Sequence, residues 1–292
     1  INAHVAYLTY QGVLGGSFSG TYSYIDDGCG SSPSSATATC NNLDDDIHTI
    51  GFRQAGQLFG IDYRGEYYYQ WGDARATAAT ATTARNNDSA NRIATAGQEV
   101  DRDAYMFGLR IGKAFNNISM KPSLTLYYDY LSGTSDADLD GSEQSWKSFN
   151  TLFDTGHKFY GLMDNYLGVG TGSSTSGTAG LGMQDYAVKA KLSPAPGWTM
   201  KADFHWFFTA EGVNASPQAG LSSRDQATGE TQNGSSSSLG NELDISLHNK
   251  YNANTNIALG FSQYVTTSAF RDLRNNVGDA ANWAYVQFDV RF

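Results

Sequence analysis

Apolar and polar residues alternate with a period of two along much of this chain, in segments about ten residues long. These segments cover residues 3–10, 17–25, 46–55, 60–71, 104–115, 123–131, 185–193, 199–208, 241–251, 256–265 and 283–292. Period-two alternation places successive side chains on opposite faces of a strand. The pattern therefore predicts about eleven β-strands and no helix.

The connections between these segments alternate between short and long. The short ones are GVLGG, GQL, NNI, SPAPG and NANT. The long ones cover about 27–45, 74–100, 132–181, 211–239 and 269–281, and are rich in Ser, Thr, Gly, Asn and Asp. This sorting is typical of an all-β, antiparallel up-and-down transmembrane β-barrel with short periplasmic turns and long extracellular loops.

The two faces of each predicted strand differ in chemistry. In 199–208, one face carries Met200, Ala202, Phe204, Trp206 and Phe208, and the other carries Lys201, Asp203, His205 and Phe207. In a soluble sandwich the charged face would be the outside, whereas in a membrane barrel it lines the lumen. The number of strands and the aromatic residues near strand ends favour the barrel.

Composition agrees with an apolar exterior and a wet interior. Charged residues make up only 16% of the chain, against about a quarter in globular domains. The net charge is −10 and no Lys/Arg cluster occurs, which argues against a nucleic-acid partner. The sequence contains no apolar run of about eighteen residues, so it predicts no helical membrane span. We expect one barrel domain over residues 1–292, in contact with outer-membrane lipids.

Two cysteines, Cys29 and Cys40, flank ten residues that are rich in Ser and Thr. They could form a disulfide in an oxidising compartment or stay as free thiols. A zinc site is disfavoured because no second Cys pair or nearby His pair completes the ligand set.

The final segment alternates up to its last residue. Ala284, Val286, Phe288, Val290 and Phe292 share one face. An outward aromatic at the C-terminus resembles the signal by which the outer-membrane assembly machinery recognises bacterial barrels. If this strand ends at the periplasmic rim, about eleven strands make an odd barrel, although bacterial single-chain barrels are even-numbered. We expect the chain to be the C-terminal part of a longer barrel, or to hide a further strand within 132–181.

The most distinctive stretch is SFNTLFDTGHKFYGLMDNYLG, residues 148–168. It resembles the alginate-export family of outer-membrane proteins, as do HTIGFR, YMFGLRIGKAF, DFHWFFTAE and GNELDISL. The matching positions are Phe149, Phe153, Thr155, Gly156, His157, Lys158, Phe159, Tyr160, Gly161, Met163 and Asp164. The resemblance covers about residues 46–292. It implies a monomeric outer-membrane channel of about eighteen strands that passes a polysaccharide such as alginate, or another hydrophilic solute.

Alternation predicts which charged residues face the lumen. The cations are Arg53, Arg64, Arg102, Arg110, Lys121, Lys189, Lys191, Lys201, Lys250 and Arg291, and the anions are Asp62, Glu66, Asp129, Asp185, Asp203, Glu242, Asp244 and Asp289. They either pair across strands and hydrate the lumen, or form a selective constriction. Arg53 and Arg110 are the strongest selectivity candidates, because GFR and GLR each place a glycine beside an inward arginine. His205 is a further solute-binding candidate, paired with Asp203 on its strand.

The long loop 132–181 is a candidate barrel lid. Its residues Phe153, His157, Lys158 and Tyr160 could narrow the passage, or its aromatic side chains could simply seal against the wall. Asp136, Asp138 and Asp140 match the first half of a calcium loop, but position twelve is Lys147 instead of Glu. The alternatives are a weak surface Ca²⁺ site and a solvated acidic loop; we expect no other cofactor.

The histidines are scattered and no Gly-x-Ser-x-Gly elbow occurs, so the sequence does not predict an enzyme. A different class of function is open: a structural or adhesive surface protein could use the barrel only to anchor its long loops.

Overall fold

The computed structural model describes residues 2–26, 46–76, 98–135, 138, 145–153, 156, 157, 159–169, 177–213, 236–274 and 278–291. Its strands are β1 (Asn2–Val13), β2 (Gly16–Asp26), β3 (Asp46–Leu58), β4 (Ile61–Ala76), β5 (Gln98–Ala114), β6 (Ser123–Leu131), β7 (Ser145–Trp146), β8 (Met183–Leu192), β9 (Trp198–Val213), β10 (Ser236–Lys250), β11 (Thr255–Thr266) and β12 (Ala280–Val290). They form one sheet of twelve strands.

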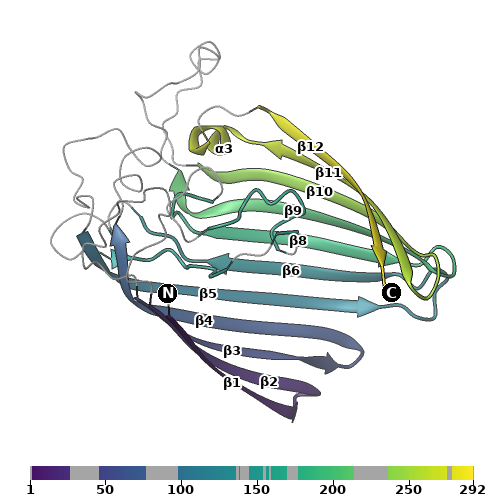
Figure 1. Ribbon diagram of the computed structural model, residues 1–292, viewed down its shortest axis with the longest axis horizontal. Coiled ribbons are helices and arrows are strands. Elements are labelled where there is room, and N and C mark those ends of the chain that lie inside the picture. The colour runs from purple at the N-terminus through teal and green to yellow at the C-terminus, as the bar shows by residue number, and fades with distance from the viewer. Residues whose placement is uncertain are drawn as a thin grey trace.

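Eleven of these strands form an antiparallel meander in which each strand pairs with the next along the chain, from β1 to β12. The two-residue β7 lies off this path and pairs in parallel with β5. The sheet is strongly curved (Figure 1). The predicted all-β, up-and-down architecture is confirmed, and the short β7 does not alter the direction of the strands that follow it.

Short turns lie at one end of the sheet and long connections at the other (Figure 1). Two of the turns contain only two residues, Leu14–Gly15 and Phe59–Gly60, with φ of 48° and 71°, and 52° and 73°. Positive φ at both central residues is the hairpin geometry that matches the right-handed twist of paired strands. The meander has an odd number of strands, so its first strand starts at the long-loop end and its last strand finishes at the short-turn end. The expected longer barrel stays a prediction.

Most of the strands are longer than the alternation indicated, although β6 covers the predicted 123–131. β4 and β9 have 16 residues each and β5 has 17, whereas about 9–11 tilted residues cross a bilayer. One face, the outer face, carries exposed apolar side chains such as Leu109, Ile111 and Leu126. On β12 the outer face holds Ala284, Val286, Phe288 and Val290, all exposed, as predicted; Phe292 lies outside the described residues.

The opposite face, the inner face, carries the buried core at its long-loop end. Phe207, Leu131, Met183 and Tyr264 of the strands are at most 1% exposed. The helix α3 (Ser268–Leu273) packs Phe270 and Leu273 into the same cluster. The sequence predicted no helix, because six residues are too few to establish a helical period; Thr267 caps α3 by accepting from Phe270 N at 3.3 Å. Among the described residues, no helix is both long and apolar enough to cross a membrane.

Candidate functional site

A segment of the longest connection lies against the inner face of the sheet. We call the described residues between 145 and 169 the inner segment. At one side, its Asn150 exchanges two hydrogen bonds with Gln70 of β4, N to Oε1 and Nε2 to O, both 2.8 Å. At the other side, Met163 N donates to Glu242 Oε1 of β10 at 2.8 Å, and Leu162 N donates to Asp244 Oδ2 at 3.3 Å. The inner segment therefore spans the inner face from β4 to β10.

Further contacts fix the inner segment at the β10 side. The Tyr166 hydroxyl is hydrogen-bonded to the Tyr264 hydroxyl, and burial, with the nearby Tyr264, raises the pKa of Tyr166 well above its usual range. Arg274, just after α3, donates to the carbonyl oxygen of Asn165. Gly161 has φ of 85°, and a Cβ there would come within 2.5 Å of the Glu242 carboxylate. A glycine is thus required where the inner segment meets β10.

On the inner face of the sheet, three adjacent register rows carry most of the charge. One row contains Arg53, Glu66, Asp129 and Asp185, the second Arg64, Arg110, His205 and Glu242, and the third Asp62, Lys189, Asp203 and Asp244. We call these twelve residues the charged belt. It holds four Arg/Lys side chains against seven carboxylates, so acid predominates at this level although the inward-facing set predicted from the sequence was near balance.

On β4–β6 the charged belt is tied together by Arg110. Its guanidinium contacts Glu66 Oε1 at 2.6 Å and Asp129 Oδ2 at 3.1 Å, and lies 3.9 Å from the centre of the Tyr127 ring. Arg64 also contacts Glu66, at 2.7 Å, and the Tyr127 hydroxyl donates to Asp129. A Cβ on Gly108 would meet Asp129 at 2.6 Å, so this glycine makes room for the cluster, as the GLR pattern suggested.

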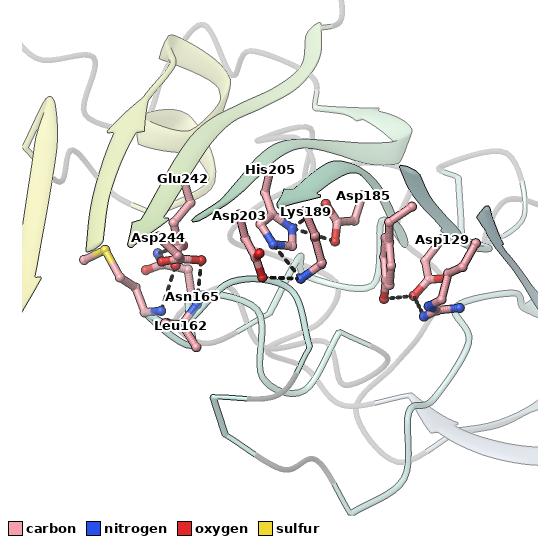
Figure 2. A network of polar contacts seen from close by, with 12 residues as sticks. Asp129, Leu162, Asn165, Asp185, Lys189, Asp203, His205, Glu242 and Asp244 are labelled. Atoms are coloured by element: carbon pink, nitrogen blue, oxygen red, sulfur yellow. Dashed lines mark hydrogen bonds and ion pairs between the residues drawn. The ribbon is translucent and has the colours of Figure 1, made fainter. Parts of the chain in front are cut away.

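On β8 and β9 the polar contacts continue (Figure 2). His205 is 1% exposed, and its Nδ1 lies 2.9 Å from both oxygens of Asp185. Lys189 Nζ lies 3.1 Å from His205 Nε2 and 3.0 Å from Asp203. An ammonium group only donates, so Nε2 accepts and the His205 proton lies on Nδ1, toward Asp185. The pairing of His205 with Asp203 expected from the sequence is therefore wrong, because His205 instead meets Asp185, its diagonal neighbour on the adjacent strand.

The other predicted lumen residues are placed differently. Arg53 is exposed on β3, and among the described residues no ion pair involves it. The glycine of its GFR pattern, Gly51, makes room for Tyr68, whose ring a Cβ would meet at 2.1 Å. Lys191 and Lys201 are exposed and opposite each other in register, nearer the short turns. Arg102 is buried at the long-loop end of β5, opposite Trp146 of β7.

The predicted constriction residues differ in burial and in their contacts. Tyr160 is buried, whereas Phe153 is 73% exposed. His157 stacks on Trp283 of β12 with ring centres 5.0 Å apart, and its Nδ1 lies 3.0 Å from Asp164. Lys158, Cys29, Cys40, Asp136 and Asp140 lie outside the described residues.

Asp138, the remaining predicted calcium ligand, is bound to Lys147 at 2.6 Å and to the Ser135 hydroxyl at 2.7 Å. Burial opposes ionisation of Asp138, but the bonds from Lys147 and Ser135 outweigh it and lower its pKa. Lys147, at position twelve of the calcium pattern, thus forms an ion pair with the Asp138 carboxylate that the pattern would offer to calcium. Among the described residues, no group of three or more His, Cys, Asp or Glu side chains could hold a metal ion.

Two cavities flank the inner segment. One, of about 360 Å³, lies between it and β2–β6, and includes Arg64, Arg110 and Tyr68 in its lining. The other, of about 530 Å³, lies toward β8–β12, and includes Lys189, His205 and Trp283. The sequence-based predictions did not name Gln70 or Trp283. They placed Glu242 and Asp244 among the inward acids but did not predict that these acids hold the inner segment.

The arrangement is a polar inner face crossed by a chain segment, with a cavity on either side of it. No curated protein matches the chain. A family model described as alginate export matches residues 6–284, nearly the whole sequence, and the chain therefore belongs to the alginate export family.

Proposed function

We propose that this chain forms a bacterial outer-membrane channel for a hydrophilic solute, and that the charged belt and the inner segment together form its narrowest part. The observation that carries the proposal is the attachment of the inner segment to both β4 and β10, with a cavity on each side. Outward apolar side chains suit lipid contact, and inward polar ones suit a wet passage. Recognition of the C-terminal strand by the assembly machinery stays a prediction.

The family description suggests a polysaccharide, such as the anionic alginate, as the solute. The charged belt is a poor match for a polyanion, because three more carboxylates than Arg/Lys side chains face the inside there. The solute class is therefore a separate question from the channel itself.

Reconstitution of the protein into planar bilayers tests the channel. We expect discrete conductance steps and, in a KCl gradient, a reversal potential that indicates a preference for K⁺ over Cl⁻. Folded protein that produces no steps would contradict the proposal and favour a barrel that only anchors its loops.

A further inference from the structure

The cavity between the inner segment and β2–β6 has walls of two kinds. At about 360 Å³ it falls within the range of small-ligand sites. Aromatic rings supply much of the surface, from Tyr68 on the sheet and from Phe149, Phe153, Phe159 and Tyr160 on the inner segment. The rest of the lining is mixed: it includes side chains of the charged belt, such as Arg64 and Asp129, neutral polar side chains, such as Gln70 and Thr151, and a few apolar ones. This combination suits a ligand that has an apolar face and a polar rim.

The charged side chains that line this cavity include equal numbers of cations and anions. Arg64 and Arg110 face Glu66 and Asp129, and all four are joined by contacts of 2.6–3.1 Å. A carboxylate on the ligand would have to compete with Glu66 and Asp129 for guanidinium groups that these acids already engage. An uncharged ligand meets no such competition.

Three buried polar atoms in the lining residues have no hydrogen-bond partner among the described residues. They are Arg64 Nε, Asp129 Oδ1 and Thr151 Oγ1. Buried polar atoms in proteins are nearly always hydrogen-bonded. One of these atoms donates, one accepts and one can do both. Hydroxyl groups, which also donate and accept, match all three.

We propose that this cavity binds one ring of an uncharged saccharide. The C–H face of a sugar ring packs on the aromatic wall, and its hydroxyls bond to Arg64, Asp129 and Thr151. The inference rests on the proposed channel for its place in transport, but binding can be measured without transport. It assigns a neutral sugar, and not a polyuronate, to the narrowest part of the passage.

Calorimetric titration of the whole detergent-solubilised chain tests this assignment. The probes are maltotriose, a neutral trisaccharide, and trigalacturonate, a trisaccharide of the same length with three carboxylates. We expect maltotriose to bind at least about fivefold more tightly. Equal or tighter binding of trigalacturonate, or no binding of maltotriose, would overturn the proposal.

Matched variants locate the site. Phe153→Ala should weaken maltotriose binding about threefold to tenfold, because it removes an exposed aromatic face from the cavity. Phe59→Ala removes an aromatic ring that is 99% exposed in the β3–β4 turn and should leave binding unchanged. Equal effects of the two substitutions would place the sugar elsewhere. Asp129→Asn should narrow the preference for maltotriose over trigalacturonate, because it removes a negative charge from the cavity.

The channel and the sugar site can be refuted independently of each other. Maltotriose binding by folded protein that shows no conductance steps would refute the channel and retain the sugar site. Conductance steps without maltotriose binding would retain the channel and refute the sugar site.

Discussion

Strands β4–β6 and β8–β10 both present carboxylates to the inner segment, but they use them differently. On β4–β6, Glu66 and Asp129 bind the guanidinium of Arg110 and leave a cavity beneath the inner segment. On β10, Glu242 and Asp244 accept backbone N–H groups of the inner segment directly. Glu66 and Asp129 therefore line a cavity beside an arginine, whereas Glu242 and Asp244 anchor a loop.

The largest effect on the free energy of unfolding is expected when Arg110 is removed from the cluster on β4–β6. Arg110→Ala leaves Glu66 with Arg64 and Asp129 with Tyr127, but removes the group that joins both acids. We expect a loss of about 3 kcal/mol in unfolding free energy, near the lower end for breaking a buried ion pair. Urea unfolding in lipid vesicles, followed by tryptophan fluorescence, measures it.

Arg53→Ala is the matched control for Arg110→Ala, since both arginines follow a glycine and an apolar residue. Arg53 is exposed, so its loss should change the unfolding free energy by less than about 0.5 kcal/mol. Both substitutions should shift the reversal potential toward stronger K⁺ preference. If Arg53→Ala destabilised the barrel as much as Arg110→Ala, the cluster on β4–β6 would have no special role.

The anchoring side is tested by removing its acids. Each lost charge-assisted hydrogen bond is worth about 1.5–3 kcal/mol, so Glu242→Ala with Asp244→Ala should favour release of the inner segment by at least about a hundredfold. Single-channel conductance should rise, because a released segment no longer narrows the passage. Heat-modifiable mobility on gels checks that the barrel has folded.

Ser246→Ala is the control on the same face of β10. Ser246 is hydrogen-bonded to His248 at 3.0 Å and has no hydrogen bond to the inner segment. The conductance of the Ser246→Ala variant should match that of the unmodified protein. Unchanged conductance in the Glu242, Asp244 double variant would show that these acids do not hold the segment in place.

The sequence predicted the strands, the sorting of turns and loops and the two faces, because these depend on a local period of two. It did not predict the anchoring of the inner segment, because Leu162 and Asp244 are 82 positions apart and meet only once the sheet has formed. It also did not distinguish Gly51 from Gly108, since the side chain that uses each gap comes from another strand. Partner choice, as for His205 and Asp185, depends on register and was mispredicted for the same reason.

Gly108→Ala tests the packing of the cluster on β4–β6 with a smaller change. The new Cβ would lie 2.6 Å from Asp129 and 3.0 Å from atoms of both Arg110 and Glu66, so the cluster must shift. Overpacking of this kind costs about 1–3 kcal/mol. Gly65→Ala on the neighbouring strand places its Cβ in open space and should not destabilise. Equal unfolding free energies for the two variants would mean that the β4–β6 cluster accommodates a methyl group freely.

The smallest effect is expected at the Asp138–Lys147 pair, which lies outside both β4–β6 and β8–β10. The pKa of Asp138 is lowered in the folded protein, so its stabilisation is present above the ordinary aspartate pKa of about 3.9 and is lost as pH falls through the lower folded value. Because the Lys147 side chain is 41% exposed, Lys147→Gln should cost less than about 1 kcal/mol at pH 7. The difference between variant and unmodified protein should shrink as pH falls below about 4. A difference in unfolding free energy that persisted at pH 2 would show that Lys147 stabilises this loop by packing and not by its charge.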